Sequence, residues 1–319
     1  SVVAVVVAIK VGKQFLKELS DCNSCLVVLD RTNFYSEEGG QLADTGFINI
    51  ASGSQLVVHD VQSYNGFVVH SCSLSGNLRV GDSVTCFLNK EKRKGLMDNH
   101  TGTHILNFSL RSVIGQTEQR GSLVAHDKLR FDFLCDKQLN GPEIIQIEQL
   151  ANQIIENDET LYTKIIPLSE ALKIEGIRAV FGETYPDPVR IVSIGISIED
   201  ALENSESGFK YSIELCGGIH VQKSSHIGEF LIISEESIGK GIRRVTCVTG
   251  FESVKAHQIA QEWEEKVKTF QLAFDELKCN KSSTGFPIDK CSALSTILSN
   301  EIAKISITHM SLNVRTKLK

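Results

Sequence analysis

Four residues in two short stretches of the sequence are of types that bind zinc. His100 and His104 are four residues apart, so a helix would place both imidazoles on one face, toward a single ion. Cys216 and His220 have the same spacing, but the two glycines between them would cost a helix interior roughly 2 kcal/mol relative to alanine. We therefore expect this second pair on a tight loop. Either pair alone is more often a solvated or core pair, and only the two together indicate a tetrahedral Zn²⁺ site.

The composition is typical of a soluble protein with two or three domains. The chain has 319 residues, of which 23% are charged and 41% hydrophobic. Its longest apolar run, Val2 to Ile9, is too short to cross a bilayer and predicts a buried strand. Nine cysteines without regular spacing, and no signal peptide, indicate free thiols in a reducing compartment. Without an initiator Met, the chain is expected to be part of a longer protein.

The net charge of −6 is not typical of a nucleic-acid-binding protein, which usually carries a basic surplus. Two basic clusters nevertheless lie in sequence beside the two halves of the predicted metal site, Lys90–Lys94 and Lys240–Arg244. Each is either a solvated face or a contact surface for an acidic partner.

Residues 1–90 predict a small closed or partly closed β-barrel, because short apolar runs alternate regularly with turn signals. The expected strands are Val2–Ile9, Leu26–Asp30, Gly46–Ile50, Gln55–Gln62, Gly66–His70 and Ser83–Leu88. Within Thr32–Gln41, adjacent Gly39 and Gly40 let backbone N–H groups approach a ligand, although an ordinary surface loop is the alternative. Cys22 and Cys25 have metal-ligand spacing but no matching second pair, so we interpret them as structural or incidental.

Residues 91–250 predict an α+β unit with a largely antiparallel sheet. A helix is expected from an N-cap at Asp98 to Gly115, and a second from Pro142 to about Glu156. The expected strands are Ser122–Val124, Lys128–Phe133, Tyr162–Pro167, Val189–Ile194, Lys210–Leu215, Phe230–Ser234 and Arg243–Thr249.

Residues 251–319 predict a helical tail. Phe251 to about Cys279 has helical periodicity, and a last helix is expected from Cys291 to about Thr308, after a loop. This pair of helices would pack on the barrel, form a homodimer or lead to a further domain.

Several separate motifs resemble the editing region of alanyl-tRNA synthetases and of their free-standing editing relatives. They are Phe34–Gln41, His100–His104, Gln119–Val124, Leu129–Phe133, Phe181–Tyr185 with Val189–Arg190, Cys216–His220 and Gly239–Arg244. The resemblance covers roughly residues 25 to 250, and nothing resembles the ATP-binding, aminoacylating domain. Ile219 stands where the family usually has Thr, and Glu38 replaces a smaller residue. Neither departure removes a metal ligand.

This resemblance implies hydrolysis of the ester that joins a wrong amino acid, serine or glycine, to the 3′ end of alanine tRNA. A site that accepts alanine cannot exclude glycine sterically and rejects serine only weakly, so a second site must remove the mistake. The implied partners are the acceptor end of tRNA(Ala) and the rest of the synthetase. The implied location is the cytoplasm, with an organellar enzyme as the alternative.

The resemblance also implies roles for individual residues. Thr103 would hydrogen-bond the serine hydroxyl, with Gln119 and Met97 lining the pocket, although a threonine in a helix often bonds its own backbone instead. Gln41 and the amides of Gly39 and Gly40 would hold the terminal ribose or the developing oxyanion. Cys216 is expected to be needed for catalysis as well as for metal binding. The acceptor stem is expected across Lys90–Lys94 and Arg243–Arg244.

The role of the metal is open at this point. Zinc with three protein ligands keeps a position for water, whereas four ligands usually form a closed structural site. This sequence offers four, so either one ligand is loose, or zinc binds the amino group or ester of the substrate while a second water attacks. No Glu follows His100, which argues against a His-Glu-x-x-His metalloprotease. The editing domain of a threonyl-tRNA synthetase and a non-enzymatic, zinc-stabilised RNA-binding module are the alternatives.

Overall fold

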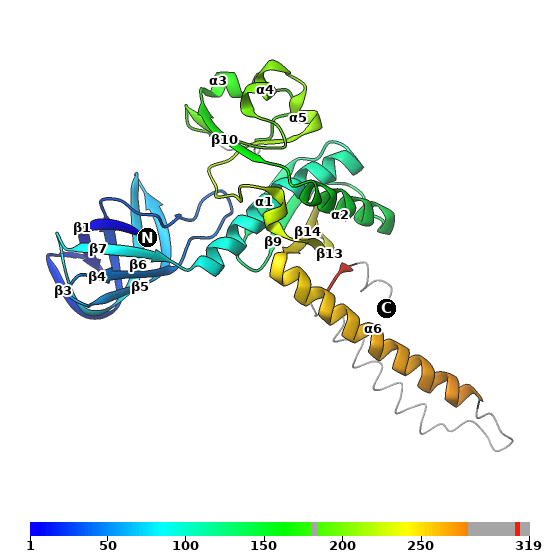
Figure 1. The fold of residues 1–319 in the computed structure, drawn as a ribbon, viewed down its shortest axis with the longest axis horizontal. Coiled ribbons are helices and arrows are strands. Elements are labelled where there is room, and N and C mark those ends of the chain that lie inside the picture. The colour runs from blue at the N-terminus through cyan, green and yellow to red at the C-terminus, as the bar shows by residue number, and fades with distance from the viewer. Residues whose placement is uncertain (180–183, 280–309, 313–319) are drawn as a thin grey trace.

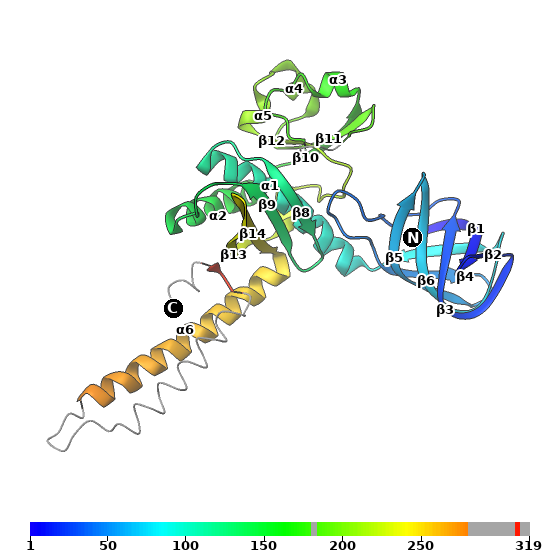
Figure 2. The same ribbon diagram turned by 180° about the vertical axis from the view of Figure 1, so that it is seen from behind.

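The structure, a computed structural model, describes residues 1–179, 184–279 and 310–312. Figures 1 and 2 show a barrel at one end, a long helix that leads from it into a central unit, a small sheet unit beside that, and a second long helix that projects away. The protein is therefore α+β, as the sequence predicts.

The N-terminal barrel is closed by β1, which pairs with β3 along one edge and with β7 along the other. The ring order is β1-β3-β6-β5-β4-β7, and the short β2 extends it beside β1. The strands are β1 (Val2–Val11), β2 (Gln14–Leu16), β3 (Glu18–Leu29), β4 (Gly46–Ile50), β5 (Gln55–Tyr64), β6 (Phe67–Arg79) and β7 (Ser83–Leu88). Alternate side chains such as Ile48, Leu56 and Val84 fill the interior. The prediction of a barrel is confirmed, although β2 and the full lengths of β3 and β6 were not predicted.

Helix α1 (Lys90–Ile114) connects the barrel to the central unit. The prediction that Asp98 is its N-cap is wrong, because Asn89 caps the helix by accepting from the backbone N–H of Lys92. Asp98 is buried inside the helix and accepts from Lys94 Nζ. The first two turns have no apolar stripe to reveal them in the sequence, but lysine, arginine and glutamate are good helix formers. Gly115 ends the helix with a positive φ, as expected.

The central unit is a four-stranded antiparallel sheet with α1 and α2 packed against one another and its core. The sheet order is β13-β14-β9-β8. Its elements are β8 (Gln119–Val124), β9 (Leu129–Leu134), α2 (Gly141–Glu156), the 3₁₀ turn η1 (Ser224–Ile227), β13 (Phe230–Gly239) and β14 (Ile242–Thr249). Leu129, Phe131 and Phe133 are fully buried, which confirms the alternation read from the sequence.

A second, smaller sheet has its own hydrophobic core around Ile191 and Ile213. It consists of β10 (Leu161–Ile166), β11 (Val189–Ile194) and β12 (Ser212–Leu215), with the short helices α3 (Leu168–Ala171), α4 (Ile198–Glu203) and α5 (Ser207–Lys210). The segment predicted as strand from Lys210 starts with the end of α5, and only its last four residues are β12. Strand β12 ends at Leu215, so Cys216 is the next residue of the chain.

Helix α6 (Gly250–Cys279) confirms the long helix predicted for the tail. Its Ala260 and Trp263 pack against Met310. The predicted loop and last helix, Cys291–Thr308, lie outside the described residues. In the described part of the chain, no helix combines the length and hydropathy needed to cross a membrane.

Candidate metal centre and its pocket

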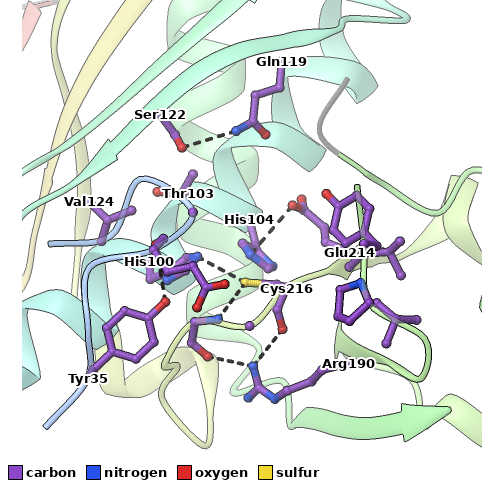
Figure 3. A pocket seen from close by; sticks show the side chains of 18 of the residues that line it. Tyr35, His100, Thr103, His104, Gln119, Ser122, Val124, Arg190, Glu214 and Cys216 are labelled. Carbon is purple, nitrogen blue, oxygen red and sulfur yellow. Dashed lines mark hydrogen bonds and ion pairs between the residues drawn. The ribbon is translucent and has the colours of Figure 1, made fainter. Parts of the chain in front are cut away.

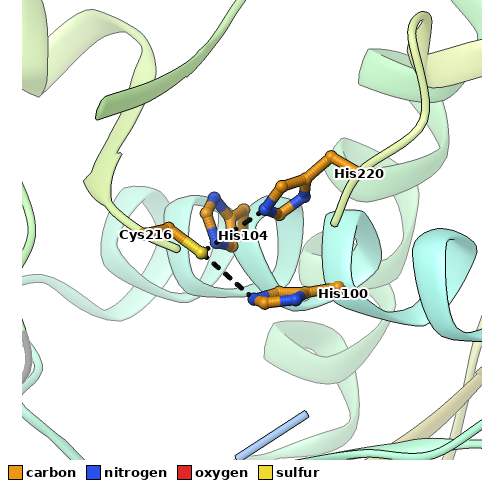
Figure 4. Close-up of side chains that lie close together, drawn as sticks. All are labelled: His100, His104, Cys216 and His220. Carbon is orange, nitrogen blue, oxygen red and sulfur yellow. Dashed lines mark hydrogen bonds between the residues drawn. The ribbon is translucent and has the colours of Figure 1, made fainter. Parts of the chain in front are cut away.

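The four predicted metal ligands converge (Figure 4). One nitrogen or sulfur atom from each of His100, His104, Cys216 and His220 lies within 4.8 Å of all the others. The Cys216 Sγ is 3.3 Å from His100 Nε2 and 3.4 Å from His220 Nε2. Tetrahedral zinc, with bonds of about 2.0 Å to nitrogen and 2.3 Å to sulfur, places such atoms about 3.5 Å apart. The side chains therefore fit a zinc ion in both chemistry and spacing.

Hydrogen bonds fix which nitrogens of two imidazoles face the sulfur. His100 Nδ1 is 2.6 Å from the side-chain oxygen of Gln41, an acceptor, so Nδ1 carries the proton. Thr101 Oγ1 donates to the Met97 carbonyl, so it accepts from His220 Nδ1 at 3.2 Å. In both rings the unprotonated Nε2 is left for a metal.

His104 lies in a different environment. Its Nδ1 is buried without a hydrogen-bond partner, and its Nε2 is 3.7 Å from a carboxylate oxygen of Glu214. An unpartnered ring nitrogen inside a cluster of imidazoles and a thiol is what a metal would satisfy. Glu214 Oε1 accepts from Asn107, and burial raises the pKa of this carboxyl to about 7.

The electrostatics of the cluster favour neutral imidazoles, the form that binds a metal. Burial, followed by neighbouring imidazoles and Arg190, lowers the pKa of His100 and of His220 well below the usual value. Burial and then Arg190 lower the pKa of His104 to about 3. All three rings are therefore available to a cation at neutral pH.

The Cys216–His220 loop is held close to α1 from two sides. Arg190 Nη1 donates to the carbonyl oxygens of Cys216 and Gly218, at 2.9 and 2.7 Å. A Cβ at Gly218 would lie only 2.0 Å from His100 Cε1, whereas one at Gly217 would meet nothing within 4 Å. Only glycine fits at position 218, and its lack of a side chain lets the loop pass this close to the helix.

A cavity of about 340 Å³ opens onto the cluster (Figure 3). Its walls come from the barrel loop, from α1, from β8 and from the segment around Arg190. Among the residues that line it are Tyr35, Gly39, His100, Thr103, His104, Gln119, Ser122, Tyr185, Arg190, Glu214 and Cys216. Segments from distant parts of the sequence thus form one small, partly polar pocket with three of the candidate metal ligands, His100, His104 and Cys216, in its wall.

The sequence matches two families, each over part of its length. Residues 1–92 match the class II (A) tRNA synthetases, and residues 189–246 match the threonyl and alanyl tRNA synthetase second additional domain. The cytoplasmic alanine–tRNA ligase of Bombyx mori is 46% identical over 79% of this chain and 27% of that enzyme. The mitochondrial alanine–tRNA ligase of Saccharomyces cerevisiae is 43% identical over 91% of this chain and 30% of that enzyme. The chain belongs to the alanyl-tRNA synthetase family. It spans less than a third of the length of these relatives.

Several of the site residues that the sequence suggested do line this pocket. Gly39, Thr103 and Gln119 are among them. Thr103 Oγ1 donates to the Asn99 carbonyl at 2.8 Å, which is the backbone bond considered as the alternative, and Gln119 Nε2 is 3.3 Å from Ser122 Oγ.

Other suggested residues lie behind the pocket or away from it. Gln41 is fully buried behind His100, and Gly40 is pressed against Ser122. Met97 packs on the core of the central unit. Arg243 and Arg244 form ion pairs with Glu235 and Asp132 across the sheet, while Arg93 and Lys94 pair with Asp44 and Asp98.

Three residues that shape the pocket have no role predicted from the sequence, which are Arg190, Glu214 and Tyr35. Arg190 and Glu214 are the only charged residues of their strands, β11 and β12, and both strands are otherwise mostly apolar, so a charge at these positions is a sequence signal of function. Tyr35 had no such signal. Burial, and then nearby Cys216, raise the pKa of its hydroxyl.

Proposed function

We propose that this region of an alanyl-tRNA synthetase hydrolyses Ser-tRNA(Ala) and Gly-tRNA(Ala). The observation that carries the proposal is the cluster of His100, His104, Cys216 and His220, of which the first three line a cavity of about 340 Å³. The relatives are alanine–tRNA ligases, enzymes for which serine and glycine are the hard amino acids to exclude. A cavity of this size is at the small end for ligand sites, which suits a small aminoacyl group.

Selection of serine would depend on Thr103. Its hydroxyl already donates to the Asn99 carbonyl, so the oxygen that lines the cavity keeps its capacity to accept. A serine hydroxyl can donate to this oxygen and the alanine methyl group cannot. A site that is built to bond a hydroxyl discriminates strongly against an analogue without one.

The four clustered side chains would hold zinc, which when bound supplies a Lewis acid for the ester carbonyl. Four protein ligands fill a tetrahedral shell. The proposal therefore requires either one loosely held ligand or an attacking water that is not itself on the metal. Gly39 would donate its amide to the ribose or the oxyanion from the cavity wall, with Gln119 beside it. Gln41, placed behind His100, would instead orient that imidazole.

The partners in this proposal are the acceptor end of tRNA(Ala) and the rest of the synthetase, in the cytoplasm. The acceptor stem would cross Lys90–Lys94 and Arg243–Arg244. Because several of these side chains are ion-paired, the positive charge available to RNA at these two surfaces comes mainly from Lys90, Lys92 and Lys240. A homodimer through the C-terminal helices stays a prediction.

The test is deacylation by the purified chain, with metal content measured on the same samples. Ser-tRNA(Ala) and Gly-tRNA(Ala) should be hydrolysed and Ala-tRNA(Ala) spared. Cys216→Ala should weaken zinc binding and slow hydrolysis by well over tenfold, whereas Cys22→Ala, which removes a thiol on the barrel, should do neither. An unchanged rate for Cys216→Ala would sink the assignment of the site.

The same assay separates the alternatives. The editing domain of a threonyl-tRNA synthetase would prefer Ser-tRNA(Thr) to Ser-tRNA(Ala). A zinc-stabilised RNA-binding module would bind both RNAs and hydrolyse neither.

A further inference from the structure

Two arginines near the pocket have buried nitrogens that find no hydrogen-bond partner among the residues that the structure describes. They are Arg111, in the last turn of α1, with its Nε and Nη2, and Arg178, with its Nε. Arg178 Nη2 donates to Gln116 at 3.1 Å. Among the described residues, neither guanidinium has a carboxylate within 4 Å, unlike Arg93, Arg243 and Arg244.

A third donor without a partner lies beside them. Thr117 is only 6% exposed, and its hydroxyl is buried and makes no hydrogen bond. Thr117 and Arg178 both line two adjoining cavities of about 150 and 560 Å³. The smaller cavity shares Gln119 and Glu214 with the pocket at the metal cluster. Adjoining cavities therefore lead from the pocket at the candidate metal ligands to Arg178 and Thr117.

The arrangement is costly as it stands. Buried donors in proteins almost always have an acceptor, and Glu214, the carboxylate whose charge acts on both guanidinium groups, lies more than 4 Å from each of them. Burial, and then the charge of Arg178, lower the pKa of the Arg111 guanidinium to about 10. The carboxylates in the small cavity already have partners, because Glu118 accepts from Arg120, and Glu214 accepts from Asn107. An anion with several acceptor oxygens would provide partners for these buried donors.

We propose that Arg178 and Thr117, with the charge of Arg111 nearby, form a subsite for a phosphate group, the phosphodiester of the RNA strand whose 3′ end reaches the candidate metal site. Guanidinium groups match the oxygens of phosphate, and phosphate contacts fix the register of a nucleic acid without reading its sequence. The RNA source rests on the proposed function. Free phosphate is the other source of the same chemistry, but the run of cavities toward the pocket favours a strand that occupies both places.

The experiment measures binding of an uncharged acceptor-stem minihelix of tRNA(Ala) at several salt concentrations. Arg178→Gln should weaken binding about tenfold at low salt and reduce the slope of log K against log[salt] by about 0.7 to 0.9, the value for one phosphate contact. Thr117→Val should weaken binding and leave the slope unchanged, because it removes a neutral donor. The matched control is Arg79→Gln, an exposed barrel arginine, which should behave as wild type.

Inorganic phosphate is the second probe. It should compete with the minihelix for the wild-type protein and lose this effect in Arg178→Gln.

A wild-type slope in Arg178→Gln, with normal thermal unfolding, would overturn the subsite. Phosphate binding that is lost in the variant while RNA binding is not would overturn the RNA assignment. If Arg178→Gln does not fold, wild-type affinity in Thr117→Val overturns the proposal. Losses of RNA affinity in a protein that hydrolyses no Ser-tRNA(Ala) would support the subsite and reject the proposed hydrolysis.

Discussion

The two pairs of side chains that make up the candidate metal site are held in place by different means. His100 and His104 belong to α1, a helix of 25 residues whose middle is buried in the central unit. Helical geometry alone puts their rings side by side, with centroids 5.3 Å apart. This half needs no contact from elsewhere to bring its two nitrogens together.

The Cys216–His220 half is a loop that depends on groups from three other segments. Arg190 of β11 donates to two of its carbonyl oxygens. The side-chain oxygen of Gln41, from the barrel loop, accepts the backbone N–H of Ile219, and Thr101 Oγ1 accepts that of Val221, directly after the loop. Metal affinity should therefore be most sensitive to changes in the loop and in the groups that hydrogen-bond it. Global stability should be most sensitive to changes along the helix.

The largest effect is expected from Gly218→Ala. The new Cβ would lie 2.0 Å from His100 Cε1, so either the loop or the imidazole must move. Because a displacement of about an ångström is enough to lose a ligand, zinc affinity should fall at least 100-fold, as measured by competition with a chelator of known affinity.

Gly217→Ala is the matched control for this change. It adds the same methyl group one residue earlier, where nothing lies within 4 Å. Zinc affinity should stay within a few-fold of wild type. Equal losses in the two variants would mean that loop flexibility, rather than contact with His100, governs the site.

A smaller loss is expected for Gln41→Ala, which removes the acceptor shared by His100 and the loop. Loss of such an outer partner typically costs 10- to 100-fold in metal affinity. Gln41→Glu keeps an acceptor oxygen and should recover most of the affinity, and Gln55→Ala, an exposed glutamine on the same barrel, should have no effect. Unchanged zinc binding in Gln41→Ala would show that the barrel loop does not support the cluster.

The same contrast explains what the sequence could and could not predict. Regular patterns were enough for the barrel, for α2 and for β9, because alternation and helical periodicity are local properties. The His100/His104 pair was also visible, since its spacing is that of one helical turn. The start of α1 was missed because its first turns lie between two cores and carry no apolar stripe.

The surroundings of the loop could not be predicted in this way. Nothing in the spacing of Gln41 shows that its side chain reaches an imidazole 59 residues away. The ion pairs of the basic clusters were hidden for the same reason, because Glu235 and Asp132 reach Arg243 and Arg244 only through strand pairing. Unpaired arginines such as Arg178 are recognisable only once their neighbours are known.

The response to pH should be shared by both halves, since its cause is burial and not chain connectivity. Below about pH 6.5 the unfolded chain protonates His104, whereas the folded chain, with a His104 pKa of about 3, does not. The unfolded state then binds more protons, so the free energy of unfolding falls with decreasing pH between these two values. The fall is up to about 1.4 kcal/mol per pH unit for one histidine.

Urea unfolding at pH 7 and pH 5, with chelator present, measures this fall. It should be smaller in His104→Asn than in wild type, and smaller too in His220→Asn, because burial also lowers the pKa of His220. If only the helix variant differed from wild type, the loop imidazole would be solvated in the metal-free protein.

The smallest effect separates stability from metal affinity. Asn89 caps α1 through its side-chain oxygen, about three turns before His100, and Asn89→Ala should lower the free energy of unfolding by about 1 kcal/mol. Zinc affinity should be unchanged, because fraying of the first turn does not reach the buried part of the helix that carries both imidazoles. Urea unfolding and chelator competition on the same preparation test both halves of this statement. A drop in zinc affinity would mean that the helix half also depends on its connection to the barrel, and the distinction between the two halves would then be lost.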